Sequence, residues 1–274
     1  MRNHAIRSNE QGVSESIGFM LIFTIVIAGI ALVTLYGYPL LLQQQLGAEE
    51  KIMEKNMIVL QNDIKSLAYK TVPFKETSLK IGGGSLTVYN SSYSPSSSAI
   101  TIRYSTSPTG VNSFQPGELR YESVKAQTDI SLQNGAVVLR PRINQGSTNG
   151  SVMLAEPRWF YDEPTNTMVI NLINITSDSI MAKEGIGTVR MRLIEIPDPY
   201  TYIDESGVDD VEIDYTPGSV QDYSVAWDNY IMKIHGMERT LSSGNPGSGE
   251  LMEYSLRNVD RLVIKKFEVR IEAI

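Results

Sequence analysis

The sequence predicts an α+β protein in which a long N-terminal transmembrane and amphipathic helix carries an antiparallel β-rich ectodomain with one later helix. Residues 17–42 form 26 consecutive positions without a charge. Apolar residues then recur at heptad spacing, and short β-branched and aromatic runs separated by turn residues follow from residue 73. We therefore expect three parts: a leader at 1–12, the long helix at 13–70 and an extracellular β-rich domain at 71–274.

The uncharged run is long enough to cross a membrane. At about 1.5 Å per residue it spans roughly 39 Å, against about 30 Å of bilayer hydrocarbon. A cleaved secretory signal has an apolar region of only about 7–15 residues, whereas here Gly37-Tyr38-Pro39 leads into further leucines. Pro39 removes one helical hydrogen bond, so we expect a kink or a locally unwound segment near the outer membrane face.

The flanking charges predict the direction of insertion. Arg2 and Arg7 precede the run, and the first charges after it are Glu49, Glu50 and Lys51. Because Lys and Arg mark the cytoplasmic side, the chain from about Gln43 onward should lie outside the cell, with membrane lipid as a partner of the helix.

Three Asn-x-Ser/Thr sequons lie in the outer part and are candidate glycosylation sites, although such tripeptides also arise by chance in Ser-, Thr- and Asn-rich chains. They are Asn90, Asn149 and Asn174. The 274 residues contain no Cys, which excludes a disulfide-stapled scaffold. The net charge of −7 argues against nucleic acid as a partner.

A heptad seam follows the apolar run. Its members are Leu46, Met53, Met57, Leu60, Ile64 and Leu67. The seam fits packing against the protein's own β domain, which we favour, or a helix-to-helix contact between subunits. Val72-Pro73 should end the helix, because the residue before a proline avoids the α region.

Strands are predicted from the short apolar runs that follow. The expected strands are 79–81, 85–89, 99–104, 119–124, 129–132, 136–140, 168–173, 189–194 and 261–274. Gly82-Gly83-Gly84 predicts a hairpin turn between the first two. Ser219 should cap a helix that places Val220, Tyr223, Trp227, Ile231 and Ile234 on the sheet. A piece beginning at about Thr71 is expected to fold alone, with the heptad helix serving mainly as packing.

The sequence contains few motifs of the kinds that form catalytic, cofactor-binding or metal-binding sites. We find no Ser-His-Asp or Cys-His set and no phosphate loop, so neither an enzyme nor a cofactor is predicted. One acidic run could bind Ca²⁺. Its residues are Asp204, Glu205, Asp209, Asp210, Glu212 and Asp214. Because Asp210, Glu212 and Asp214 alternate with apolar residues, the wet face of a strand is the favoured interpretation.

The octet Gly12-Val13-Ser14-Glu15-Ser16-Ile17-Gly18-Phe19, with the apolar helix after it, resembles the class III signal region of archaeal type IV pilins and archaellins. The wider layout, with Ala226-Trp227-Asp228-Asn229-Tyr230 and the closing strand, is similar to an uncharacterised group of archaeal pilin-like membrane proteins. The resemblance implies cleavage by a prepilin peptidase between Gly12 and Val13, which leaves the helix on the mature protein. Gln11 departs from the pattern, since archaeal sites usually carry a charge there.

Glu15 is the candidate assembly residue. It lies third after the proposed cut, whereas bacterial pilins place their acid fifth. Glu15 could neutralise the Val13 ammonium of a neighbouring subunit, or, with Ser14 as N-cap, favour the helix dipole. The resemblance implies a minor pilin-like subunit of a type IV pilus-like filament, with other subunits as partners. The alternative is a membrane-anchored ectodomain that binds or supports the cell surface without polymerising.

Overall fold

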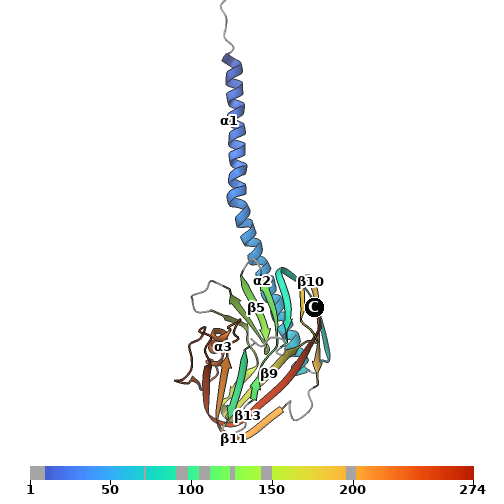
Figure 1. Ribbon diagram of the computed structural model, residues 1–274, viewed down its shortest axis with the longest axis vertical. Helices are drawn as coiled ribbons and strands as arrows, with labels where there is room; N and C mark the ends of the chain where they lie inside the picture. The colour runs from blue at the N-terminus through green and yellow to red at the C-terminus, as the bar shows by residue number, and fades with distance from the viewer. Residues whose placement is uncertain are drawn as a thin grey trace, which may run out of the picture. The chain divides into compact units, whose positions relative to one another are not determined.

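The computed structural model describes residues 10–70, 72–90, 98–104, 112–123, 127–142, 150–195 and 202–274, apart from the side chains of 10–15 and 112 (Figure 1). The chain forms two compact units, Met1–Ala48 and Glu49–Ile274. The predicted fold class is confirmed: a long N-terminal helix is followed by a β-rich domain with one later α-helix.

The first unit contains α1, Glu10–Leu32, the π-helical segment η1, Val33–Gly37, and the start of α2, Tyr38–Lys70. The Tyr38 N–H bonds the Val33 carbonyl five residues back, so the expected disturbance before Pro39 is confirmed as a π-helical turn. The prediction that Ser14 is the N-cap was wrong for the uncut chain, because Ser14 lies inside α1. The helix already begins at Glu10, because no proline stands between Glu10 and Ser14 and the cost of Gly12, about 1 kcal/mol, does not end the helix.

The second unit contains the rest of α2, the strands, the 3-10 turn η2 (Glu163–Thr165) and α3 (Ser224–Ile231). The strands are β1 Phe74–Tyr89, β2 Ala99–Tyr104, β3 Asn112–Phe114, β4 Glu118–Ser123, β5 Thr128–Gln133, β6 Ala136–Pro141, β7 Val152–Ala155, β8 Trp159–Asp162, β9 Thr167–Thr176, β10 Met181–Ile194, β11 Tyr202–Thr216, β12 Met237–Arg239 and β13 Met252–Ala273.

These strands form one sheet in the order β3-β2-β11-β13-β10-β1-β4-β5-β6-β7, with β12 and β9 also on β13 and β8 on β9. All pairs are antiparallel except β9 with β13, which run parallel from Thr167 opposite Arg261 to Thr176 opposite Arg270. The closing strand β13 is therefore the centre of the sheet, and β11 and β10 pair with successive parts of it.

The hairpin predicted at Gly82-Gly83-Gly84 was wrong. These glycines lie inside β1, which pairs with β10 on both sides of the glycines and with β4 along its second half. Gly83 adopts φ +67° at the irregularity, and a Cβ on Gly84 would lie 2.2 Å from the Glu122 carbonyl oxygen. The glycines therefore permit a bulge and a close strand approach instead of a chain reversal.

The heptad residues of α2 are built into the core of the β unit. Met53, Met57, Leu60, Ile64 and Leu67 have no exposed surface and pack with apolar side chains of β1, β4, β5, β9, β10 and β13. Packing against the protein's own β domain, the favoured interpretation of these five residues, is confirmed. The buried Gln61 amide also donates to the carbonyls of Gly135, at 2.7 Å, and Glu156, at 3.0 Å.

The later helix is shorter than predicted. It begins at Ser224, because an Asp222 carboxylate oxygen accepts the Ser224 N–H at 2.8 Å, so Ser219 as a cap was wrong. Val220 is 64 % exposed outside the helix. The rest of the stripe does pack as expected: Tyr223, Trp227, Ile231 and Ile234 are buried in a second apolar core with β2, β9, β11 and β13.

Candidate functional site

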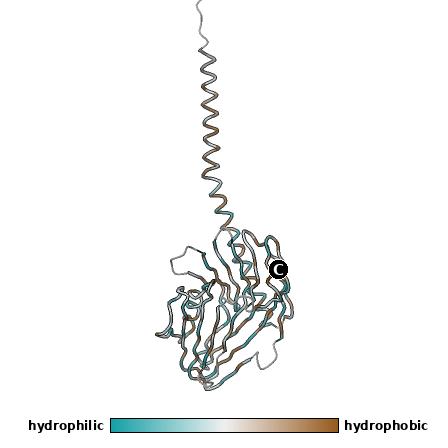
Figure 2. The backbone as a smooth tube through the Cα atoms, viewed as in Figure 1, coloured by the Kyte–Doolittle hydropathy of each residue, from teal (hydrophilic) through white to brown (hydrophobic). Residues whose placement is uncertain are grey.

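The apolar helix is the first candidate for function. The large apolar side chains between Ile17 and Leu42 are exposed, from 36 % at Leu42 to 71 % at Phe19. Within the described residues, one helical stretch, Ser16–Lys70, holds a segment long and apolar enough to cross a membrane. Figure 2 shows this run in predominantly hydrophobic colours. The helix is therefore compatible with single-pass membrane anchoring.

The predicted processing residues lie at the start of this helix. Gly12, Val13 and Glu15 belong to the first two turns of α1, so the Gly12–Val13 peptide bond is helical in the uncut chain. The side chains of residues 10–15 lie outside the described atoms. Cleavage and assembly stay predictions.

Two of the three sequons have structural contacts that the sequence did not signal. The Asn90 amide donates to the Ser177 carbonyl at 3.1 Å, and the Asn174 amide oxygen accepts the Gly117 N–H at 3.0 Å. Asn149 lies outside the described residues. Glycosylation stays a prediction, and Asn174 additionally holds β9 against the turn that enters β4.

The acidic run forms cross-strand ion pairs. On β11, Asp204 pairs with Arg261 of β13, which together with the Tyr202 hydroxyl lowers the pKa of Asp204 to about 2. Arg103 of β2 lies 2.9 Å from Glu212 and 2.6 Å from Asp214. The strand interpretation is confirmed, although Asp214 is buried under Arg103. Across the described part of the chain, no three His, Cys, Asp or Glu side chains gather as a metal site.

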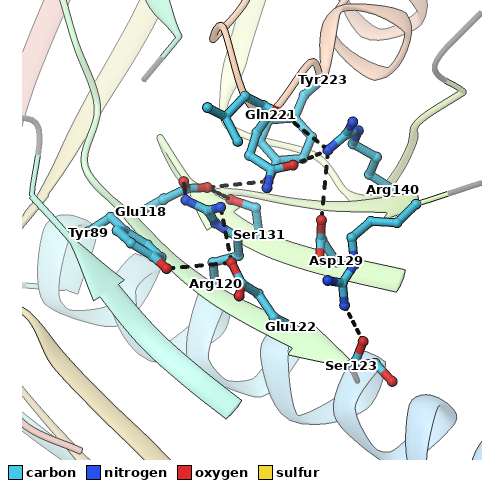
Figure 3. A network of polar contacts seen from close by, with 12 residues as sticks. Tyr89, Glu118, Arg120, Glu122, Ser123, Asp129, Ser131, Arg140, Gln221 and Tyr223 are labelled. Atoms are coloured by element: carbon cyan, nitrogen blue, oxygen red, sulfur yellow. Dashed lines mark hydrogen bonds and ion pairs between the residues drawn. The ribbon is translucent and has the colours of Figure 1, made fainter. Parts of the chain in front are cut away.

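A buried polar network occupies β4 and β5 (Figure 3). Arg120, 6 % exposed, pairs with Glu118 at 2.6 Å, and the Ser131 hydroxyl donates to Glu118 at 2.5 Å. The Arg120 guanidinium also lies 4.1 Å from the centre of the Tyr89 ring. The alternation of Glu118, Arg120 and Glu122 in the sequence is the signal from which this network could have been predicted.

Asp129 is the most deeply buried acid of this network. It has no exposed surface, and burial raises its pKa to about 6 against the opposing effect of Arg142, 3.0 Å away. Arg140 lies 3.8 Å from the same carboxylate and also donates to Gln221, which precedes α3 (Figure 3). The network therefore links β4, β5 and β6 to the segment before α3, and we assign it a structural role.

A groove of about 1030 Å³ opens where β10 and β11 part. Strand β9 occupies one edge of β13 from Arg261 to Arg270, so β10 and β11 share the other edge. There β11 reaches Lys265 and β10 reaches Glu268, which leaves Lys266 and Phe267 between the two strand ends. The groove is lined by residues from these strands and from α2, β8 and β9.

Comparison with known proteins identifies a family to which the chain is similar. A family model described as a family of unknown function, DUF7289, matches residues 11–272. No curated protein and no solved structure matches the chain. The matched range begins next to Gly12 and ends near the end of β13, so it takes in the apolar helix together with the whole β unit.

Proposed function

Because the chain belongs to a family whose function is unknown, we propose from its own residues that it is a minor pilin-like structural subunit of an archaeal type IV pilus-like surface filament. One observation carries the proposal. The helix α2 begins in the apolar, exposed unit and ends with Met53, Met57, Leu60, Ile64 and Leu67 in the core of the β unit. The anchor and the β domain thus share one helix.

This sharing favours a subunit that keeps its apolar helix. A detachable signal can be removed without loss to the folded domain, whereas cutting within α2 would remove part of the core. The family match supports the same view, because it includes the apolar helix and the β unit in one range.

The apolar helix has features that suit its transfer from lipid to contacts with other helices. Gly18 and Gly29 have no atom within 4 Å of an added Cβ, so both positions present open backbone surface. Small residues of this kind allow helices to approach closely in a membrane or in a filament core. In the filament, Glu15 would gain the Val13 ammonium of a neighbouring subunit as its partner. A prepilin peptidase, membrane lipid and other subunits are the partners that this function requires.

The decisive experiment is mass analysis of the N terminus of the native protein. We expect the chain to begin at Val13, and Gly12→Leu to leave the full-length precursor in the membrane. Glu15→Ala should permit cleavage but reduce the share recovered in sheared surface filaments. Glu10→Ala is the matched control, since it removes an acid from the leader and should leave both processing and shearing unchanged.

An anchored ectodomain that does not polymerise predicts a different pattern. The protein would retain Met1 or Arg2, remain in the membrane fraction and respond to neither Gly12→Leu nor Glu15→Ala. The groove beside β13 favours this second function as a binding role for the β unit, because it is built from β-unit residues alone. An intact leader together with an empty sheared fraction would exclude the filament subunit.

A further inference from the structure

We propose that the groove between β10 and β11 binds an acidic saccharide, such as a short chain of uronic acid residues. The site follows from the topology of the sheet: Ile194 ends β10 opposite Glu268, and Tyr202 begins β11 opposite Lys265. The groove of about 1030 Å³ is just above the range of about 300–1,000 Å³ common for small-molecule sites.

The charge of the groove is opposite to that of the protein. Arg158, Lys265 and Lys266 line it, with Glu195 as the acid among its lining residues. The whole chain carries a net charge of −7. Lys266 is half-buried, and this burial lowers the pKa of its ammonium. Cations gathered in this way in an acidic protein select for an anionic ligand.

Exposed aromatic rings, which can pack against a sugar ring, also line the groove. Phe160 and Tyr202 line the groove and remain 42 % and 43 % exposed. The Lys265 ammonium lies 5.8 Å from the centre of the Tyr202 ring, so a cation and an open ring adjoin each other. A pyranose ring presents its C–H face to an aromatic ring while its carboxylate reaches a neighbouring cation, and this arrangement offers both contacts at once.

The inner wall holds a polar group without a partner. The hydroxyl oxygen of Tyr69 is buried and has no hydrogen-bond partner among the described residues. Its ring is fixed by Phe267, edge-on at 5.4 Å, and by the Arg158 guanidinium at 5.2 Å from the ring centre. A buried hydroxyl left unbonded is costly. Because this oxygen has almost no accessible surface, a ligand hydroxyl or carboxylate would reach and satisfy it only after a small movement of the groove wall.

A nucleic acid fits this surface less well than a saccharide. Single-stranded nucleic acid needs a basic track that follows a phosphate at every residue. Here Glu195 lines the groove itself, and Asp204 lies two residues beyond Tyr202 on β11. The cationic surface is therefore short, which suits a short saccharide that carries a few carboxylates.

The proposal does not depend on filament assembly and can be tested on the full chain in detergent micelles. Isothermal titration with tetragalacturonate should show binding that weakens with added salt, while maltotetraose, the neutral counterpart, and sulfate alone should not bind. Lys265→Gln and Arg158→Gln should each weaken binding at least about tenfold, and Tyr202→Leu about threefold to tenfold. Arg190→Gln is the matched control, because it removes an exposed arginine paired with Glu76 outside the groove.

Circular dichroism of each variant shows whether it is folded. Lys265 and Tyr202 are exposed at the surface, so their variants remain informative if Arg158→Gln unfolds. No heat of binding with tetragalacturonate, or equal loss in Arg190→Gln and Lys265→Gln, would overturn the proposal. Tighter binding of a thymidine tetranucleotide or an acidic peptide than of tetragalacturonate would overturn the ligand class.

Discussion

The amphipathic half of α2 should be indispensable to the β unit, contrary to the expectation that a piece from Thr71 folds alone. Met53, Met57, Leu60, Ile64 and Leu67 have no exposed surface. Burying each such side chain contributes about 1.5–3 kcal/mol, or about 10 kcal/mol for the five. Because domains have a total stability of about 5–15 kcal/mol, a fragment of residues 71–274 should not fold cooperatively.

The assay compares fragments 49–274 and 71–274 by urea unfolding, followed by tryptophan fluorescence. The longer fragment should show one cooperative transition, and the shorter should bind a dye for exposed apolar surface and lack that transition. A peptide of residues 49–70 added to the shorter fragment should restore the transition. A cooperative transition of 71–274 at the same urea midpoint would refute the reasoning.

Point variants of the 49–274 fragment measure how much the buried face of α2 contributes to the free energy of unfolding. Leu60→Ala should lower the free energy of unfolding by about 2–5 kcal/mol, because a fully buried leucine leaves a cavity. Val59→Ala, one residue earlier and 47 % exposed, is the control and should cost less than about 1 kcal/mol. Equal effects of the two would show that α2 does not use this face in solution.

Three further predictions concern the β1 bulge, pH and topology. Gly84→Ala should destabilise the β unit by several kcal/mol in thermal melting, because its Cβ would lie 2.2 Å from the Glu122 carbonyl oxygen, while Gly47→Ala, in open space on α2, should not. Burial raises the pKa of Asp129 to about 6, so its contribution to stability is full below the unfolded pKa of about 3.9 and is lost as pH rises through 6. The stability of the wild type relative to Asp129→Asn should therefore fall by about 2–3 kcal/mol between about pH 4 and pH 7, and a constant difference would contradict this. Protease added to intact, wall-free cells should remove the chain after about Gln43, and survival of the β unit until lysis would show the opposite orientation.

The sequence by itself determined the features that depend on local pattern. An uncharged run of 26 residues predicts an apolar helix long enough to cross a membrane, and heptad spacing from Met53 to Leu67 marks one buried face. Strands such as Ala99–Tyr104 were predicted with their observed bounds because β-branched residues and flanking turns act over a few positions. Pro39, which follows η1, also acts locally, because its missing N–H removes one helical hydrogen bond.

Errors arose where a remote partner decides the local structure. Gly82-Gly83-Gly84 has the composition of a turn, yet β4 and β10 hold it extended within β1. The Ser219 error is different, because the competing partner is local: Asp222 accepts the N–H of Ser224, two residues later, and starts the helix there. The short strands β7 and β8 carry too little pattern of their own, because their order comes from pairing with β6 and β9.

What only the tertiary structure decided is which residues meet. Arg158, Lys265 and Tyr202 lie in three separate parts of the sequence, and no spacing relates them. They line one groove because β13 is long enough to receive two different strands on one edge, with an opening between their ends. In the same way, Glu118, Arg120 and Asp129 form a network because β4 and β5 bury their polar faces beneath the segment that enters α3. The sequence determines the chemistry of each side chain. Its charge and its partners depend on distance and burial, which arise only when strands pair across the chain.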